Sequence, residues 1–562
     1  MERTEAIEHA IPFLVSLGSK LTHSLRDDAI KLLHFRTGVK KSSLSSDLDA
    51  ALKKTRQTEA QNATGVGSVK SSGLLIYAEG GEFFHTSTEE VGCRIKDKGR
   101  YQIYMIGRKN SPMGQYLITC YYRECGAAPE DSKLTEALGT LRARAKVDGI
   151  SAELCTRIGW KDSSIYVDLA NEAGDFVEIN AKGWRVSNGK CPVFFRRTPG
   201  TQSLPVPVGG GSLRELLRFL NISDPKDGNM ILGWLIGVMS RGPYGHLTLR
   251  GHRGSAKTTV TRLLKSLIDP HDRTLAELTT DQKSLGIAAR NSHILTFDNL
   301  SDVSNKQSDW FCRLSTGGGL TARRLYTDDD EIVMKFRRPA ILNSIVNLVT
   351  RGDLSQRCIT ITLPPFEGRA RLTEAELDED FQRLHPRLLG ALLDAVSMAL
   401  RNLPNISAAD CPRLLDFSLF MDAAAPALGL PSDYFRNALI ENQRQSAEIE
   451  MDENVIVHVL KHVFDKKISL SGGQKSYELR ASATNIWIEL SKVAKEILPV
   501  SSSSWPNSTI RFSSEFSRIE PQLADQGIRV IRTRGHRGSR LTIITYDPTK
   551  LEGENTAERQ AA

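Results

Sequence analysis

The chain has 562 residues, of which 40% are hydrophobic and 25% charged, with a formal net charge of +8. This length is too great for one ordinary core, so we expect a soluble globular protein of several domains. The longest strongly apolar stretch, MILGWLIGVM, is too short to span a bilayer, which argues against a membrane protein. The modest positive charge permits nucleic-acid binding without arguing for it.

The first residues and the cysteines give the expected compartment. MERTEAIEHAIPFLVSLG carries three glutamates and no basic n-region with a cleavage site, so no signal peptide is predicted. The eight cysteines are scattered, without a CxxC pair or a histidine partner at zinc spacing. We therefore expect a cytoplasmic protein with reduced thiols and no membrane association.

Hydrophobic periodicity and breaker residues divide the chain into regions. Helical spacing dominates the start, mixed strand and helix signals follow, and PGTQSLPVPVGGGS forms the clearest boundary. Short apolar strands then alternate with helices, a pattern that predicts a parallel sheet. The expected regions are a helical part at 1–60, a mixed α/β accessory domain at 74–198, a core at 213–365, a helical part at 366–450, a small domain at 451–548 and a disordered tail at 549–562.

The pentapeptide GHRGS occurs twice, and its first copy lies in YGHLTLRGHRGSAKTTVTRLLKSL. An apolar strand, a glycine loop, Lys257-Thr258 and an apolar-periodic helix form the context of a phosphate-binding loop. Lys257 would reach the terminal phosphates of ATP, and Thr258 would bind Mg²⁺. The predicted ATP-binding residues are Gly251, Gly254, Ser255, Ala256, Lys257, Thr258 and Thr259. The alternative is a glycine-rich turn before a helix.

One residue of this loop departs from the usual pattern. Ala256 stands where glycine is usual, and its methyl group is tolerable if the residue has helical dihedral angles. A second element strengthens the nucleotide interpretation, because SHILTFDNLS is an apolar strand that ends in Asp298. Such a carboxylate, about forty residues after a P-loop lysine, would hold Mg²⁺ directly or through water.

The following segments resemble superfamily 3 helicases of the AAA+ class, particularly the helicase-type ATPases of phages and prophages. RLSTGGGLTARRLYTDDDEIVMKFRRPAILNSI contains a glycine turn, an expected β-hairpin and a strand ending in Asn343. TRGDLSQRCITITLPP then places Arg357 before another strand. The resemblance is strong over about 243–365 and extends weakly through the stretch from IYVDL to GWRV. It implies a P-loop NTPase core that hydrolyses ATP with Mg²⁺.

The same resemblance implies roles for single residues. Lys257, Thr258 and Asp298 would hold the nucleotide and metal, and Asn343 would be the sensor that positions water against the γ-phosphate. Arg357 would be an arginine finger that reaches the nucleotide of a neighbouring subunit. That role requires self-association into a ring, usually a hexamer in this family. The alternative for Arg357 is an ordinary surface salt bridge.

Two features differ from the family pattern. Asn299 follows Asp298 where many such ATPases have a carboxylate, and an amide orients water but accepts no proton. We include Asn299 among the catalytic candidates and expect hydrolysis, which could be slow. The hairpin tip is expected at Asp328–Asp330, where acid repels DNA, so the predicted contacts to single-stranded DNA in the ring channel are Arg323, Arg324 and Tyr326. Tyr326 has the alternative of a core position.

The second GHRGS lies in QGIRVIRTRGHRGSRLTIITYD, without Lys-Thr and without a following helix. This copy cannot be a P-loop. Two alternating strands flank it, and with the helices before it the segment is typical of a winged helix. Its basic hairpin is predicted to contact duplex DNA through Arg532, Arg534, Arg537 and Arg540, with Arg529 nearby. The alternatives are a solvated hairpin and a protein-contact wing.

The predicted fold is an α/β P-loop NTPase core of the AAA+ superfamily 3 type, with helical and mixed α/β N-terminal regions and a C-terminal winged-helix-like α+β domain. The predicted function is an ATP-dependent DNA helicase or translocase ring acting in replication of a phage, prophage or related mobile element. The alternative is a nucleotide-gated DNA-binding ATPase, such as an initiator, regulator or defence protein, that does not unwind DNA.

Overall fold

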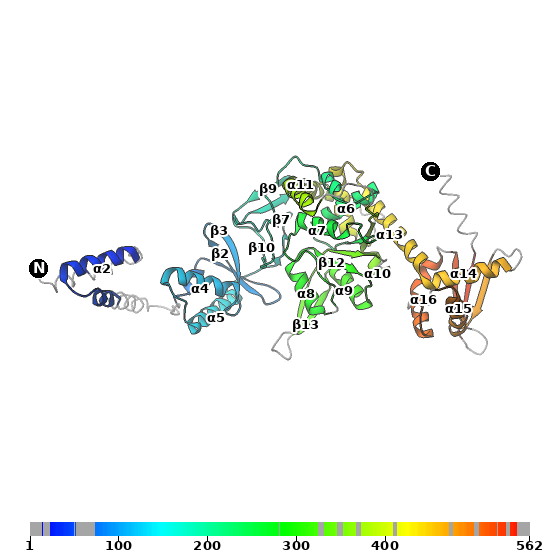
Figure 1. Cartoon of the computed structure of the whole chain (residues 1–562), viewed down its shortest axis with the longest axis horizontal. Helices are drawn as coiled ribbons and strands as arrows, with labels where there is room; N and C mark the ends of the chain where they lie inside the picture. The colour runs from blue at the N-terminus through cyan, green and yellow to red at the C-terminus, as the bar shows by residue number, and fades with distance from the viewer. Residues whose placement is uncertain are drawn as a thin grey trace. The chain divides into compact units, whose positions relative to one another are not determined.

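The structure, a computed structural model, describes most of the chain as two compact units (Figure 1). The described residues are 10, 14, 23–49, 51, 73–279, 281–323, 331–345, 352–366, 373–407, 413–470, 476–498, 505–524, 527–534 and 540–547. One unit comprises Met1–His85, Glu90–Ile95 and Tyr104–Ile150. The other comprises Thr86–Glu89, Lys96–Ile103 and Ser151–Ala562.

The N-terminal region contains a short helical part and a small α/β fold. Helix α2 spans His23–Thr37, and a second helical stretch covers residues 41–49. Further along, a four-stranded sheet has the order β3-β2-β1-β4. Its strands and its two helices are β1 (Glu82–His85), β2 (Val91–Asp97), β3 (Arg100–Met105), β4 (Ile150–Ser151), α4 (Pro112–Cys125) and α5 (Asp131–Val147). Apolar residues of both helices share one core with β1 and β2.

Local sequence explains where helix α4 begins and ends. Ser111 caps its N-terminus by accepting a hydrogen bond from the Gly114 amide, and Pro112 occupies the first turn, where its missing N–H costs nothing. Gly126 ends the helix in a left-handed conformation with φ of 70°, which glycine adopts without strain.

The second unit begins with an antiparallel sheet of order β6-β7-β8-β9, formed by Ile158–Lys161, Ser164–Asp168, Phe176–Asn180 and Gly183–Ser187. The short strands β5 (Leu154–Cys155) and β10 (Phe194–Phe195) pair beside it. The buried side chains of this sheet, such as Ile165 and Ile179, belong to the same apolar core as the helices that follow. The structure therefore divides the accessory domain expected at 74–198, because the strands after residue 150 need the later helices to cover their apolar face.

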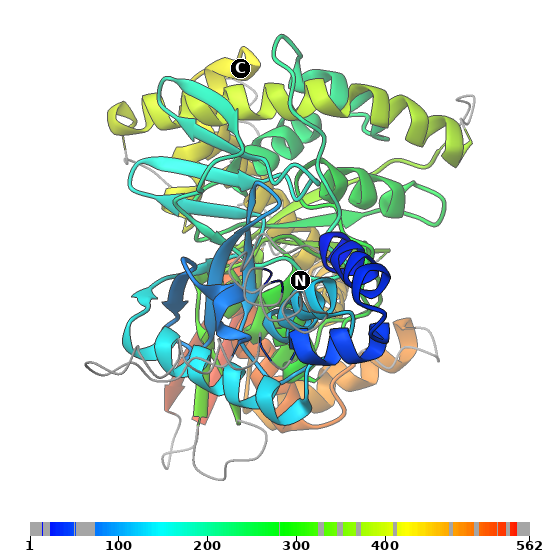
Figure 2. The same cartoon turned by 90° about the vertical axis from the view of Figure 1, so that its left-hand side faces the viewer.

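The long helix α11 (Glu374–Asn402) supplies much of that cover and lies against β8 and β9 (Figure 2). Side chains of α11 also bond to this sheet. The Trp184 indole donates to Asp394 Oδ1 at 2.8 Å, and Ser397 Oγ donates to the Asn180 carbonyl at 2.7 Å. Residues 151–198 are thus built into the second unit.

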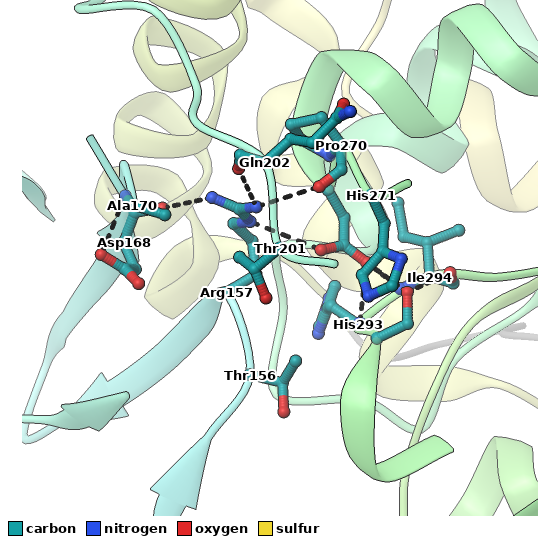
Figure 3. A network of polar contacts seen from close by, with 12 residues as sticks. Thr156, Arg157, Asp168, Ala170, Thr201, Gln202, Pro270, His271, His293 and Ile294 are labelled. Atoms are coloured by element: carbon teal, nitrogen blue, oxygen red, sulfur yellow. Dashed lines mark hydrogen bonds and ion pairs between the residues drawn. The ribbon is translucent and has the colours of Figure 1, made fainter. Parts of the chain in front are cut away.

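A buried polar network joins this sheet to the rest of the unit, and Figure 3 shows Arg157 and His293 within it. Asp269 is its central acceptor. Asp269 Oδ2 accepts hydrogen bonds from the backbone amides of His293 and Ile294 at 2.8 and 3.0 Å. Lys265 lies 3.3 Å from the same oxygen, and Arg157 Nε lies 3.4 Å from Oδ1. Burial opposes ionisation of Asp269, but these two cations hold its pKa below the usual range. The network is a buried ion cluster in which each charge has partners.

The centre of the second unit is a parallel four-stranded sheet of order β12-β15-β11-β16. Its strands are β11 (His246–Arg250), β12 (Leu295–Leu300), β15 (Ala340–Ser344) and β16 (Cys358–Thr362). A parallel bridge between Ala276 and Phe297 extends it beyond β12. The associated helices are η3 (Leu213–Phe219), α6 (Pro225–Gly237), α7 (Lys257–Ile268), α8 (Gln282–Asn291), α9 (Asn305–Thr316) and α10 (Gly352–Ser355). The parallel sheet predicted from the alternating pattern is confirmed.

Strands β13 (Gly319–Arg323) and β14 (Glu331–Lys335) form an antiparallel hairpin between α9 and β15. A hairpin is what the sequence predicts at this place. Its expected acidic tip, Asp328–Asp330, lies outside the described residues.

The region after the parallel sheet is helical in its described parts. After α11 come η4 (Leu403–Asn405), α12 (Leu415–Ala424), η5 (Ala425–Leu428) and α13 (Tyr434–Glu453). Helix α13 contributes Phe435 and Leu439 to the main core, whereas Met451 near its end belongs to the core of the next domain. None of the helices that the structure describes is both long and apolar enough to cross a membrane.

The C-terminal domain has the element order helix, strand, helix, helix, strand, strand. The elements are α14 (Val455–Leu470), β17 (Tyr477–Ala481), α15 (Ala483–Ile497), α16 (Thr509–Leu523), β18 (Ile528–Arg534) and β19 (Arg540–Tyr546). The strands form an antiparallel sheet of order β17-β19-β18. Its helices and strands enclose a separate apolar core. The tail expected at 549–562 lies outside the described residues.

Three buried histidines of the second unit are held as neutral rings. The Nε2 atoms of His246, His293 and His385 lie 2.9, 2.9 and 3.3 Å from the carbonyl oxygens of Phe311, Val238 and Leu267. Their Nδ1 atoms have no partner among the described residues. Burial lowers the pKa of each ring to about 4.

We therefore expect the second unit to lose stability in mild acid. In the unfolded chain these histidines bind protons as the pH falls below 6.5, the ordinary pKa of histidine. In the folded protein the rings stay neutral down to a pH of about 4. Stability should fall across this window by up to about 1.4 kcal/mol per pH unit for each histidine. His385→Gln should flatten the slope measured by denaturant unfolding between about pH 4.5 and 7. The exposed His458→Gln is the control, and an unchanged slope in His385→Gln would contradict the assignment.

Candidate functional site

The loop between β11 and α7, which the sequence predicts to bind phosphate, is shaped by two glycines. Gly251 follows the strand, and a Cβ atom there would lie 2.6 Å from Ser255 Oγ and 2.8 Å from the Leu363 carbonyl oxygen, so no side chain fits. Gly254 has φ of +79°, a conformation that glycine adopts freely. The amide groups at the start of α7 follow directly, as an anion site at a helix N-terminus requires.

Ala256 is the N-cap of α7 and has φ of 66° and ψ of 22°. From the sequence we expect the alanine methyl group to be tolerated if the residue has right-handed helical dihedral angles. The structure does not meet this condition, because Ala256 is left-handed. A left-handed alanine costs about 1–2 kcal/mol relative to its relaxed conformation. The loop thus adopts the backbone that glycine would favour, although its sequence supplies alanine.

Lys257 points into the loop. Its Nζ donates to the carbonyl oxygens of Gly251 and His252 at 2.6 and 2.9 Å and lies 3.3 Å from Ser255 Oγ. Burial lowers the pKa of Lys257, while the charge of Asp298 opposes the shift. The ammonium group is therefore held by neutral oxygens, and an anion in the loop would be its natural counter-charge.

A continuous chain of hydrogen bonds crosses the carboxyl ends of the strands beside this lysine. Thr258 Oγ1 donates to Asp298 Oδ2 at 2.8 Å, and Asn343 Nδ2 donates to Asp298 Oδ1 at 2.9 Å. The buried Thr261 Oγ1 donates in turn to Asn343 Oδ1 at 2.8 Å. The structure thus brings together four predicted residues, Lys257, Thr258, Asp298 and Asn343, from three separate segments of the chain.

Two other residues contribute to this arrangement and have no role in the sequence analysis. Thr261 lies one helical turn after Lys257 and fixes the direction of the Asn343 amide; its spacing along α7 could have indicated it. The buried Asn221 donates from Nδ2 to the Ser255 and Pro364 carbonyl oxygens at 3.1 and 2.8 Å. Asn221 therefore ties the phosphate loop to the segment after β16, and no sequence pattern marks it.

The other two catalytic candidates, Asn299 and Arg357, do not belong to this chain of hydrogen bonds. Asn299 is exposed, next to Asp298, and has φ of 55°. Arg357 is buried, with 8% of the residue exposed, and its Nη1 lies 2.8 Å from Asp353 Oδ1 of the same chain. In this conformation the Arg357 guanidinium faces its own α10 segment instead of the protein surface.

Few of the predicted DNA contacts can be placed. Arg324, Tyr326 and Arg537 lie outside the described residues, and Arg323, Arg534 and Arg540 are placed only at strand ends by their pairing. Arg532 is exposed, and its Nη2 donates to Ser517 Oγ at 2.7 Å and forms an ion pair with Glu520 on α16. Its charge is therefore shared with the neighbouring helix.

The left-handed Ala256 gives a test of the loop geometry. Ala256→Gly should raise the stability of the nucleotide-free protein by about 0.5–1 kcal/mol, because strain relief exceeds the extra entropy of unfolded glycine. Ala288→Gly, in the middle of α8, is the matched control and should cost about 0.5–1 kcal/mol. Thermal unfolding of both variants measures the difference. Destabilisation by Ala256→Gly equal to that of the control would contradict the described backbone.

The donor set suits a nucleotide with Mg²⁺. Thr258 and Asp298 offer a hydroxyl and a carboxylate oxygen 2.8 Å apart, and Mg²⁺ prefers such hard oxygen ligands together with phosphate and water. Among the described residues, no group of three histidine, cysteine or acidic side chains could hold a metal by itself.

Solved structures show only distant similarity to this chain. The structure titled "The A form apo structure of NrS-1 C terminal region-CTR" is 13% identical, has a TM-score of 0.38 and matches 85% of this chain and 99% of that chain. A structure of JCV Helicase with a bound small molecule is 12% identical, has a TM-score of 0.18 and matches 37% of this chain and 67% of that chain. Curated proteins gave no match.

Family models give the more specific relationship. Residues 213–439 match the model described as "Actinomycete integrative conjugative element replication protein". Residues 457–558 match the model described as "AICE RepA C-terminal domain". The two matches cover successive parts of the chain, from the helices before the phosphate loop through the C-terminal domain. Over these two ranges the chain is similar to the replication proteins of actinomycete integrative conjugative elements.

Proposed function

We propose that the protein is an ATP-dependent DNA motor, a helicase or translocase that acts in replication of an integrative conjugative element. The observation that carries this proposal is the bonded group Thr258–Asp298–Asn343 beside Lys257. It joins a phosphate-binding lysine, a hydroxyl and carboxylate suited to Mg²⁺, and an amide suited to orienting water. Those are the parts that ATP hydrolysis requires, since phosphoryl transfer depends on positioning and charge stabilisation.

The sheet order supports the AAA+ superfamily 3 assignment. The strand before the phosphate loop, β11, lies between β15 and β16, and the strand ending in Asp298, β12, lies on the far side of β15. Asn343 on β15 is thereby next to Asp298, as a sensor residue of this class should be. The hairpin β13–β14 precedes the sensor strand, at the position that the resemblance predicts.

With a nucleotide bound, the residues would divide the work. Lys257 would leave the loop carbonyls and hold the β- and γ-phosphates, and Thr258 with Asp298 would hold Mg²⁺, which would neutralise phosphate charge. Asn343, fixed by Thr261, would orient the attacking water. The amides from Gly254 to Thr259 would surround the phosphates.

The C-terminal domain is proposed as a winged helix that binds duplex DNA. Its element order and three-stranded sheet support this fold, with β18–β19 as the wing. The ion pair between Arg532 and Glu520 means that Arg532 would have to exchange a carboxylate for a phosphate. The other predicted contacts between the wing and duplex DNA are Arg534, Arg537 and Arg540.

A second function is favoured by two specific observations. Asn299 provides an amide where a carboxylate would accept a proton, and Arg357 is bonded within its own chain. Both features are compatible with an ATPase that assembles on DNA, such as a replication initiator, without unwinding it. Strand displacement on a forked substrate separates the two functions, because the alternative predicts ATP hydrolysis without displacement.

The motor proposal is tested with Lys257→Ala. Loss of the phosphate-binding ammonium should lower ATP hydrolysis by about a hundredfold or more, the scale of losing one group that stabilises transition-state charge. Forked-DNA displacement should disappear with it. Lys306→Ala, which removes an exposed lysine on α9, is the control. Normal turnover in Lys257→Ala would show that the assigned phosphate loop is not the site.

Arg357 is tested separately, because the proposed ring, expected as a hexamer, needs a residue that acts between subunits. Asp353 Oδ1 lies 2.8 Å from both Arg357 Nη1 and Arg413 Nη1, so we expect Arg357→Ala and Asp353→Asn each to lose stability, about 1–3 kcal/mol, through lost charge-assisted bonds. A finger that acts across subunits would instead impair only Arg357→Ala in turnover. Assemblies that mix Arg357→Ala with Lys257→Ala subunits would then regain ATPase activity.

A further inference from the structure

A cluster of exposed arginines lies at the opposite edge of the parallel sheet from the phosphate loop. Arg241 precedes β11, Arg337 precedes β15, and Arg313 lies in the last turn of α9. Because both strands are parallel, residues before them lie at the amino edge, whereas Lys257 and Asp298 lie at the carboxyl edge. The cluster therefore belongs to a different surface from the nucleotide site.

Backbone hydrogen bonds hold the three segments together. The Tyr244 amide donates to the Ser315 carbonyl at 3.0 Å, and the Arg338 amide donates to the Leu314 carbonyl at 3.0 Å. Arg337 Nη1 donates to the Arg241 carbonyl oxygen at 3.0 Å. These bonds give the arginines a fixed frame, so that little entropy is lost when a ligand binds to them.

Glycines allow the arginine side chains to lie this close to the backbone. Gly242 has φ of +73°, and a Cβ atom there would lie 2.4 Å from Arg337 Cδ. A Cβ atom on Gly317 would lie 3.1 Å from Arg337 Nε, and one on Gly318 would lie 2.9 Å from Arg313 Cβ. Arg313 and Arg337 therefore flank the two glycines that lead into the hairpin β13–β14.

The charges of the cluster have no acidic partner among the residues that the structure describes. Arg241 stacks on the Trp160 ring at 4.9 Å and donates from Nη2 to the Asp162 carbonyl at 2.7 Å, which leaves its charge uncompensated. Two acidic residues lie close to the cluster: Asp162, whose carbonyl accepts from Arg241, and Asp309, one turn before Arg313. Neither forms an ion pair with these arginines in the described part of the chain. Unpaired guanidinium groups on one surface favour a polyanionic ligand.

We propose that Arg241, Arg313 and Arg337 bind the phosphate backbone of single-stranded DNA at the base of the hairpin. Guanidinium groups suit phosphate because they offer several donors in one plane. The position favours nucleic acid over an acidic protein, since the cluster is continuous with the hairpin that carries the predicted DNA contacts Arg323, Arg324 and Tyr326. This inference rests on the proposed DNA-binding function, but it places a contact surface outside both the hairpin tip and the wing.

The test is the salt dependence of binding to a labelled oligo(dT) by the full-length chain without nucleotide. The slope of log affinity against log salt is negative, and each single-strand phosphate contact contributes about 0.7 to its magnitude. Replacing all three arginines by glutamine should therefore reduce that magnitude by about 2. Replacing them by lysine keeps the charge and should keep the slope. Arg401→Gln is the matched control, because exposed Arg401 also donates to a backbone carbonyl, at 2.9 Å from Ala181 O.

Two results would overturn the inference. An unchanged slope in the glutamine variant would leave the cluster as a surface for an acidic protein partner. A lysine variant that loses as much as the glutamine variant would show that binding failed through misfolding instead of lost charge. ATP hydrolysis without DNA is measured in the same samples. It tests the proposed ATPase independently of DNA binding by the arginine cluster. If the wild-type protein hydrolyses ATP and the glutamine variant has an unchanged salt slope, the arginine cluster is refuted as a DNA contact while the proposed ATPase stands.

Discussion

The buried carboxylate of Asp269 is the contact on which the arrangement of the second unit depends. It lies at the end of the phosphate-loop helix α7 and accepts amide hydrogen bonds from the segment that enters β12. Through Arg157 it also reaches the sheet β6–β9, since the same guanidinium donates to the carbonyl oxygens of Asp168 and Gln202 at 2.8 and 2.7 Å. Breaking such a buried pair costs about 3–5 kcal/mol, because the remaining charge would be stranded in the core.

Asp269 also supports the proposed nucleotide site. Helix α7 begins with Lys257 and Thr258, and β12 ends with Asp298, so Asp269 joins the far ends of the two elements that carry the site. Their near ends are joined by the bond between Thr258 and Asp298. With both ends fixed, the donors proposed for phosphate and metal would be pre-organised, as catalysis by charge stabilisation requires.

The parallel sheet separates two kinds of chemistry on one unit. Its carboxyl edge gathers the phosphate loop, Asp298 and Asn343, whereas its amino edge presents the arginine cluster and the base of the hairpin. A motor of the proposed kind needs both a nucleotide site and a nucleic-acid surface that can respond to it. Arg337 lies just before β15 (Ala340–Ser344) and Asn343 lies near its end, which gives a short covalent path between the two surfaces.

Much of this protein was determined by local sequence. Apolar strands alternating with helices predicted the parallel sheet, which the structure confirms, because this signal depends only on neighbouring residues. The glycines and Lys257 of the first GHRGS predict a phosphate loop by the same kind of local signal, and that role stays a proposal. The second GHRGS, without Lys-Thr and without a following helix, lies between two paired strands, as its alternation predicted.

Tertiary structure alone decided the rest. The left-handed Ala256, the inward Arg357 and the pairing of Arg532 with Glu520 follow from neighbours in space. The roles of Asn221 and Thr261, the division of the accessory region near residue 150 and the arginine cluster each join segments far apart in the sequence. Periodicity shows which face of an element is buried, but the residues that meet there are selected by how the elements pack.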